Sequence, residues 1–200
     1  MSEHRQKTYN DAVAFHGHSC PGLALGYRVA AKALEWLEAE RSGDEEIVAV
    51  VENDSCAVDA IQVMTGCTFG KGNLIFRDIG KRAYTFHNRR TGKGVRIVDH
   101  FAGFESPQNQ ELNKSVFGGT ATNEQKEQWQ LLFQKSIDDI LHAPEKDILT
   151  IMDARTAPPS RAHVFASVTC SICKEQVMEP RAVKTDTGVY CADCADSRDG

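Results

Sequence analysis

The stretch His16-Gly17-His18-Ser19-Cys20-Pro21-Gly22 places two imidazoles and one thiol within seven residues. Imidazole and thiolate groups hold soft or borderline metal ions, so this density predicts a metal site or a reactive centre. A second interpretation makes the two histidines solvated turn residues and Cys20 a small buried hydrophobic side chain. The stretch by itself favours neither interpretation over the other.

A helix is predicted to begin directly after this stretch. Pro21 suits the first helical position, because the N–H that proline lacks has no partner there in any case. Apolar residues then recur at alternating spacings of four and three, which predicts one apolar face extending to about residue 40. Cys20 would lie at the N-terminal end of this helix, where unpaired N–H groups and the helix dipole favour a thiolate.

A second cysteine is predicted at the start of another helix. The β-branched run 47–51 indicates a short buried strand, and the Asp54-Ser55 pair after it offers a cap for a helix with Cys56 in its first turn. Asp59 would lie about one turn further on, on the side of Cys56. Cys67 follows this helix in a glycine-rich loop. Because functional residues gather at such helix ends and loops, we expect these side chains to approach the first cluster.

Composition limits the classes of function. The chain has 200 residues, 41% of them hydrophobic and 26% charged, which is typical of a globular protein with a substantial core. Its net charge of -5 argues against general nucleic-acid binding. Neither a membrane-spanning apolar run nor a secretory signal is recognised. We therefore expect a cytoplasmic protein, in which seven cysteines serve metal binding or chemistry more often than disulfides.

Two features suggest contact with an anion. The loop that contains Lys71 lacks the spacing of a nucleotide-binding phosphate loop, although Lys71 itself is a candidate to touch an anionic cofactor or substrate. Between Arg77 and Arg96 the chain carries seven basic residues and one acidic residue. This basic hairpin is either a solvated edge that charge keeps soluble, or a site for an anionic ligand or partner.

The remaining elements of the first part of the chain follow from periodicity and capping. Thr8 is predicted to cap a short helix that runs to Phe15. Residues 102–121 are predicted to be a loop with some helical potential. The capping box at residues 122–125 opens an amphipathic helix to about His142, whose aromatic residues are expected in the core. The strands expected after the glycine-rich loop are 74–76, 84–87, 95–99 and 148–152.

The end of the chain has a different character. Two C-x-x-C pairs are separated by seventeen residues, within the range of a four-cysteine zinc site. A segment of about 35 residues has little other means of ordering itself. From residue 165 onward four basic residues face six acidic ones, so protein contact is expected rather than nucleic-acid binding. The predicted ligands of a structural zinc ion are Cys170, Cys173, Cys191 and Cys194.

The motifs together resemble a known family. The first stretch, the segment Asp54-Ser55-Cys56-Ala57-Val58-Asp59-Ala60-Ile61-Gln62, and the run from Thr65-Gly66-Cys67-Thr68 to Gly70-Lys71-Gly72-Asn73 are similar to the E-subunit family of formylmethanofuran dehydrogenase, over roughly residues 8–155. The terminal cysteine spacing resembles the zinc finger of the DksA/TraR family. We therefore expect an α+β core of the E-subunit type at 1–157, a linker at 158–164 and a four-cysteine finger at 165–200.

The resemblance implies an α+β fold, with helices packed on a mixed or antiparallel sheet, and an intertwined homodimer. It also implies a metal or active site in the core. The family's catalytic redox centre belongs to other subunits, so the resemblance does not make this chain a dehydrogenase. Polymerase binding of the DksA type is not expected, because no long acidic coiled coil is present. The candidates carried over by motif are His16, His18, Cys20, Cys56, Asp59 and Cys67.

Three hypotheses follow. In the first, the chain is an accessory subunit or small metalloenzyme linked to molybdenum or tungsten one-carbon metabolism. Cys20, Cys56 and one imidazole hold a second metal of unknown identity with one position open, Asp59 orients a ligand, and Lys71 or the basic hairpin receives an anionic small molecule. In the second, the same ligands close around a metal that the protein senses or delivers. In the third, a dimeric adaptor acts through a protein partner of the finger.

Overall fold

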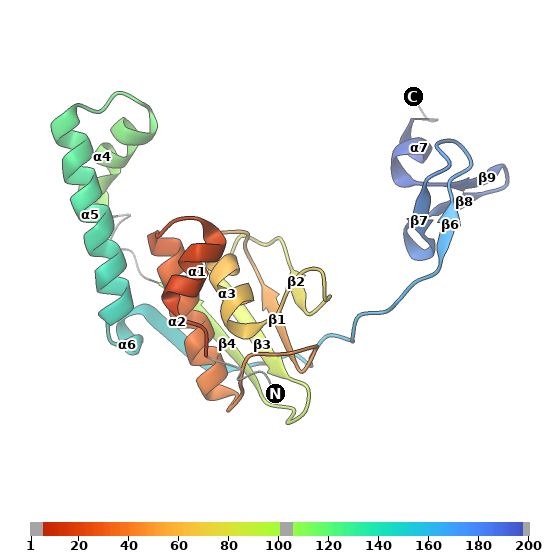
Figure 1. Ribbon diagram of the computed structural model, residues 1–200, viewed down its shortest axis with the longest axis horizontal. Coiled ribbons are helices and arrows are strands. Elements are labelled where there is room, and N and C mark those ends of the chain that lie inside the picture. The colour runs from red at the N-terminus through yellow and green to blue at the C-terminus, as the bar shows by residue number, and fades with distance from the viewer. Residues whose placement is uncertain (1–5, 101–105, 198–200) are drawn as a thin grey trace. The chain divides into compact units, whose positions relative to one another are not determined.

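The computed structural model describes residues 6–100 and 106–197 and divides the chain into two compact units (Figure 1). The first unit spans Met1–Arg161 and the second Ala162–Gly200. Among the described residues, no helix combines the length and the apolar composition that crossing a membrane requires.

A five-stranded sheet forms the centre of the first unit, in the order β2-β1-β3-β4-β5. β1 pairs with β2 in parallel, and the other three pairings are antiparallel. The predicted α+β class with a mixed sheet is thereby confirmed. The strands are β1 (Ile47–Val51), β2 (Leu74–Phe76), β3 (Ala83–Asn88), β4 (Gly94–Asp99) and β5 (Leu149–Asp153).

Helices cover one face of this sheet, where Figure 1 shows α1, α2 and α3 side by side. The main core lies between them and the strands, with Val29 and Leu37 from α2 and its C-cap, Ile61 from α3, and Phe86 and Ile97 from the sheet. These five side chains are fully buried, and each contributes about 1.5–3 kcal/mol by leaving water. The helices of the unit are α1 (Tyr9–His16), α2 (Pro21–Trp36), α3 (Ala57–Thr65), α4 (Pro107–Phe117), α5 (Asn123–His142) and α6 (Glu145–Ile148).

The start of α2 follows the sequence prediction and its end does not. Cys20 is the N-cap residue, and Pro21 takes the first helical position. The helix ends at Trp36 rather than near residue 40, because Leu37 caps it and Glu38 adopts a left-handed φ of 47°. α1 is capped by Thr8 as predicted, and its capping box is completed by Asp11.

A close approach of α2 and α3 positions the two helix starts next to each other. Gly26 of α2 faces Ala57 of α3 so closely that an added Cβ would lie 2.2 Å from the Ala57 carbonyl oxygen. At Gly22 an added Cβ would lie 3.3 Å from Cβ of Cys56. Two glycines therefore let the helices pack backbone to backbone and bring Cys20 near Cys56.

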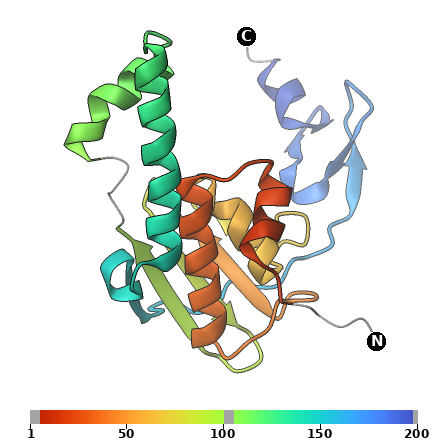
Figure 2. The ribbon, with the colours of Figure 1, turned by 60° about the vertical axis from the view of Figure 1, so that its left-hand side comes forward.

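The segment expected to be loop-like contains a helix. Residues 102–105 lie outside the described residues, but α4 follows them and packs against α5 (Figure 2). Only the second half of α5 reaches the core, through Ile137 and Ile140, which pack with Leu25 of α2. Trp129 stacks on Phe133 with ring centroids 4.7 Å apart and meets Phe117 edge to face. Of the aromatic residues expected in the core, Phe133 packs against buried clusters of the first unit, whereas Trp129 serves the contact between α4 and α5.

The second unit is small and built from short elements. Two antiparallel hairpins, β6–β7 and β8–β9, carry the two C-x-x-C pairs at their ends. Among its described residues, the only buried hydrophobic side chains are Cys170 and Tyr190. Its elements are β6 (Ser167–Thr169), β7 (Gln176–Met178), the 3-10 turn η1 (Glu179–Arg181), β8 (Val183–Thr185), β9 (Gly188–Tyr190) and α7 (Ala192–Asp196).

Candidate metal site

Three side chains from three helix ends meet in the first unit. His16 is the last residue of α1, and Cys20 and Cys56 are the N-cap residues of α2 and α3. One imidazole nitrogen and the two sulfur atoms all lie within 4.8 Å of one another. Gly17 makes the turn that returns the chain from α1 to Cys20, with a left-handed φ of 94°. The predicted meeting of thiols from two separate helix starts with a neighbouring imidazole is present.

The His16 ring is oriented by a carboxylate behind it. Its Nδ1 lies 2.7 Å from Oδ2 of Asp59, and its Nε2 faces the Cys20 sulfur at 3.9 Å. The Gln62 amide donates to the other oxygen of Asp59 at 3.4 Å. Histidines that bind metals usually donate their second N–H to a carboxylate in this way, which fixes the tautomer and the ring orientation. Asp59 therefore positions the ligand nitrogen rather than joining the cluster.

The surroundings of Cys20 favour its neutral form when no cation is bound. Burial, together with the neighbouring Cys56, raises the pKa of the Cys20 thiol to about 11, although the Leu23 N–H donates to its sulfur at 3.3 Å. A positive ion between the sulfur atoms would reverse this balance, because a coordinated thiol loses its proton. The donor set of two sulfurs and one imidazole fits borderline-soft ions such as Zn²⁺.

Three of the predicted site residues lie outside this cluster. His18 is exposed, with its ring 4.5 Å from the ring of His16. Cys67 is fully buried in the main core, where its thiol donates to the Ile47 carbonyl and burial raises its pKa to about 11. The Lys71 ammonium lies against the carbonyls of Ser42, Gly43 and Asp44, with the shortest distance 3.1 Å to Asp44.

The basic hairpin is largely paired within the protein. Arg96 holds Glu52 through two hydrogen bonds, one of them 2.8 Å long, and lowers the pKa of that carboxyl group. Arg82 donates to Asp99 at 2.7 Å, and Lys93 pairs with Glu38 at 2.7 Å. Of the two interpretations of this stretch, the contacts do not favour an anion site, because they pair these cations internally.

A pocket of about 360 Å³ opens beside the cluster. Its polar wall follows β1, and its apolar wall includes two exposed aromatic side chains, Phe69 at 79% and Phe76 at 46% exposure. The sequence prediction did not select these two residues as site candidates, although Phe69 lies in the glycine-rich loop and Phe76 is the last residue of the predicted strand 74–76. The lining residues are His16, Val51, Asn53, Asp54, Ser55, Cys56, Val58, Asp59, Phe69, Leu74 and Phe76.

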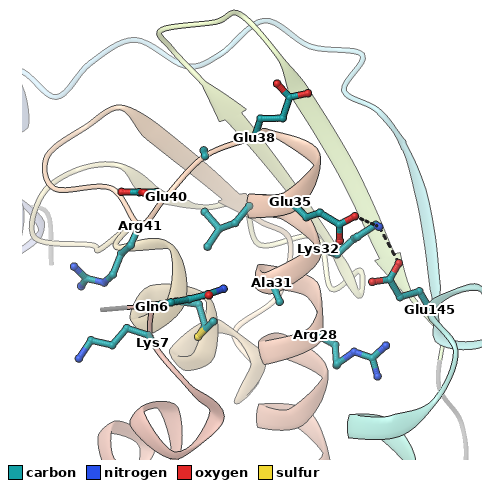
Figure 3. Close-up of a pocket in the computed structure, with 13 residues that line it drawn as sticks. Gln6, Lys7, Arg28, Ala31, Lys32, Glu35, Glu38, Glu40, Arg41 and Glu145 are labelled. Atoms are coloured by element: carbon teal, nitrogen blue, oxygen red, sulfur yellow. Dashed lines mark hydrogen bonds and ion pairs between the residues drawn. The ribbon is translucent and has the colours of Figure 1, made fainter. Parts of the chain in front are cut away.

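A larger cleft of about 800 Å³ lies along the second half of α2 (Figure 3). Among the described residues that line it there is no cysteine or histidine. Its cations are mostly engaged, since Lys32 bridges Glu35 and Glu145 and the Arg28 guanidinium donates to backbone carbonyls near the end of α5. The smaller pocket is therefore the one that the cluster of metal-ligating side chains adjoins.

The second unit holds a separate cluster of four cysteines. Their four sulfur atoms all lie within 4.8 Å of one another, and the residues are Cys170, Cys173, Cys191 and Cys194. The Cys191 N–H donates to the Cys170 sulfur at 3.4 Å, and backbone donors of this kind lower the pKa of Cys170 to about 6. Four thiols on two tight turns form the arrangement of a closed, structural zinc site.

Comparisons with known proteins agree with both units. Residues 165–200 match the prokaryotic DksA/TraR C4-type zinc finger. The chain is also similar to a protein of known crystal structure from Syntrophus aciditrophicus. That protein is described as similar to the E subunit of tungsten formylmethanofuran dehydrogenase (FmdE), and the two sequences are 25% identical. Its TM-score is 0.61, and the match covers 94% of this chain and 90% of that one.

A curated relative comes from Archaeoglobus fulgidus. It is named a probable S-adenosyl-L-methionine-binding protein and is 34% identical over 189 residues, which cover 90% of this chain and 51% of that protein. The chain thus spans about half the length of this relative. Residues 15–150 match the family model described as FmdE, molybdenum formylmethanofuran dehydrogenase operon. The resemblance noted from the motifs is confirmed, and the chain belongs to the FmdE family.

Proposed function

We propose that the first unit binds a metal ion through Nε2 of His16 and the thiolates of Cys20 and Cys56, with one coordination position facing the 360 Å³ pocket. The observation that carries this proposal is the placement of Asp59 behind the imidazole at 2.7 Å, which leaves the other nitrogen aimed at the thiols. Such backing is typical of metal ligands and is not needed by a solvated turn histidine.

An open site is favoured over a closed one. Closed zinc sites use four protein ligands, whereas catalytic sites use three and leave a position for water or substrate. Within the described residues, the cluster contains three ligating side chains, and His16 and Cys56 both line the pocket. A bound metal would act as a Lewis acid on a ligand in that pocket. This favours a small metalloenzyme or accessory subunit over a protein that only senses or delivers the metal.

The biological setting that we propose is accessory to molybdenum or tungsten one-carbon metabolism, as the family's name suggests. Free thiols in a chain of this kind also suit the reducing cytoplasm. The FmdE-like protein of Syntrophus aciditrophicus supports this setting only through similarity.

A homodimer is part of the same proposal. Most of α4 and the first half of α5 lack contact with the core, and Phe117 and Leu131 there are 75% and 74% exposed. Surfaces of this kind mark contact with another protein. A second copy of the chain is the partner expected from the family resemblance. The four-cysteine finger remains a candidate to contact a different protein.

Metal content of the full-length protein tests the proposal. We expect two zinc ions per chain in the wild type, one in each cluster, and one in Cys20→Ser and in Cys56→Ser. Cys67→Ser is the matched control, because Cys67 is a buried cysteine outside both clusters, and it should retain both ions. An unchanged metal content in Cys20→Ser and Cys56→Ser would contradict the core site.

A further inference from the structure

We infer that the pocket beside His16 and Cys56 accepts a small ligand with a planar apolar body and no negative charge, either neutral or cationic. This inference rests on the proposed metal site and adds the class of ligand to it. It departs from the anionic ligand that Lys71 and the basic hairpin led us to expect. The charges, the walls and the volume of the pocket each bear on it.

The charged groups of the pocket are all acidic. Asp54 and Asp59 line it, and the lining residues that the structure describes include no lysine or arginine. Asp59 is engaged by His16 and Gln62, whereas Asp54 is exposed and has no hydrogen bond or ion pair within the described part of the chain. A divalent metal ion held by two thiolates adds no net charge to the site, and the described residues that line the pocket supply no lysine or arginine, so an anion would meet these carboxylates and a cation would be attracted.

Two of the cations near the pocket are engaged elsewhere in the protein. Arg96 holds the buried carboxylate of Glu52, the residue that follows β1. Lys71 is directed to carbonyls of residues 42–44, which precede β1, whereas the pocket is lined by Val51 at the end of that strand. Neither charge is positioned to neutralise an anionic ligand.

The side-chain hydroxyl and amide donors of the pocket are also occupied. The Ser55 hydroxyl donates to the Asn53 side chain at 2.7 Å, and the Asn53 amide donates to the Lys81 carbonyl at 2.8 Å. Sites that recognise carboxylate or phosphate groups often present arginine side chains in a bidentate geometry. This pocket instead presents the oxygen atoms of Asp54 and Ser55, which suit a ligand that donates hydrogen bonds.

The remaining walls are apolar and partly aromatic. Val51 and Leu74 are buried at the base, while the rings of Phe69 and Phe76 are 79% and 46% exposed. An exposed aromatic side chain beside a pocket offers a face for a planar group or for a cation. A volume of about 360 Å³ lies at the small end of ligand sites, which suits a molecule with one ring.

The test uses full-length protein loaded with cobalt(II) and three probes that share one ring and differ in charge: benzylamine, benzamide and benzoate. Cobalt in the four-cysteine cluster is closed to added ligands, so changes in the visible absorption spectrum report the core site. Benzylamine and benzamide are expected to bind at least about tenfold more tightly than benzoate. Binding of benzoate as tight as that of benzamide, or no binding of any probe at millimolar concentration, would overturn the inference.

Substitutions of lining residues show which side chains of the pocket contribute to ligand binding. Phe69→Ala and Phe76→Ala should each lower the affinity for benzamide about three- to tenfold, since each removes an aromatic face. Asp54→Asn should lower the affinity for benzylamine and leave the affinity for benzamide unchanged. Phe165→Ala is the control, because Phe165 is an exposed phenylalanine, at 48% close to Phe76, and lies outside the pocket. A chain that binds only one cobalt ion refutes the metal site itself, whereas two bound ions with a preference for benzoate refute the ligand class alone.

Discussion

Both ring nitrogens of His16 have a neighbouring polar group, and these contacts set which nitrogen is free to bind a metal. Asp59 accepts a hydrogen bond from Nδ1, so the lone pair of Nε2 points toward Cys20. Asp59 itself is placed by its position in the first turn of α3, one turn beyond Cys56. The ligand and the group that orients it therefore come from different helices, and the packing of those helices sets the geometry of the site.

Removal of the Asp59 charge should weaken the binding of the core metal, although none of the three proposed ligands is removed. Asp59→Asn is expected to raise the dissociation constant of the core metal about 10- to 100-fold, because the amide no longer fixes the tautomer of His16. Competition with a chromophoric zinc chelator measures this constant. Asp54→Asn is the control, because Asp54 lines the same pocket but does not contact His16. It should change the dissociation constant less than about threefold. Equal losses in the two variants would show that net charge, not orientation, is responsible.

Residue type predicted part of the site and could not predict the rest. Cys20 and Cys56 were recognisable because each precedes a helix, marked by Pro21 in one case and by the end of a strand in the other. Cys67 has the same chemistry, but its loop turns beneath β1 and its thiol bonds to the Ile47 carbonyl. Cysteine serves equally well as a ligand and as a small core side chain, so only the tertiary path distinguishes the two roles.

The packing of α2 against α3 is the element on which the site depends. The backbone of Gly26 lies so close to Ala57 that a side chain has no space, and Cys20 and Cys56 lie at the same end of the two helices. This contact fixes the distance between the sulfur atoms more directly than any hydrogen bond in the cluster.

Gly26→Ala should separate the two helices. An added methyl group 2.2 Å from a backbone oxygen requires movement of the backbone, and we expect a loss of at least about 3 kcal/mol in the free energy of unfolding. Gly43→Ala is the control, because an added Cβ there meets nothing within 4 Å. Chemical denaturation gives the stability, and metal analysis of the folded variant shows whether the site survives. Retention of full stability and both metal ions would contradict this account of the contact.

The pairing of Glu52 with Arg96 ties the end of β1 to β4. Glu52 is 4% exposed, and Arg96 lowers the pKa of its carboxyl group below the ordinary value of 4.5. Because the folded pKa is lower than the unfolded one, the pair stabilises the fold above about pH 4.5 and loses this effect as the pH falls through the folded pKa.

Glu52→Gln should therefore destabilise the protein most at neutral pH. The loss expected there is about 2–4 kcal/mol, since the partly buried guanidinium loses its counter-charge, and the difference from wild type should shrink on acidification. Denaturant unfolding at several pH values measures it. Glu38→Gln, which breaks an exposed pair with Lys93, should leave the stability nearly unchanged at any pH, because solvent screens that pair. A loss of equal size at pH 3 and pH 7 would show that packing, not charge, is involved.

Elements with local signals were predicted well, and elements that depend on a partner were not. The run 47–51 is a fully buried strand, and the capping box at Thr122 starts α5. α4 lies in the stretch predicted as a loop with some helical potential, and it has no side-chain cap and few apolar residues to define a face. Its helical form is supported by α5, through contacts that periodicity does not reveal.

At the scale of the whole molecule, the two units are stabilised by different means. The first has a continuous hydrophobic core between helices and sheet. In the second, Cys170 and Tyr190 are the only buried hydrophobic side chains among the described residues. An interior of that size does not offset the conformational entropy of ordering a unit of this length, so we expect a zinc ion bound by the four cysteines to stabilise it.

Removal of zinc should consequently unfold the second unit alone. In full-length protein treated with a strong chelator, we expect fast hydrogen exchange and proteolytic cleavage within residues 165–200, while the strands of the first unit stay protected. Cys170→Ser should reproduce this pattern without chelator and with the core metal in place, which separates loss of the finger from loss of the His16 site. The first unit should melt at nearly the same temperature in wild type and in this variant. A single cooperative transition in which both units lose protection together would mean that the finger contributes to the stability of the core.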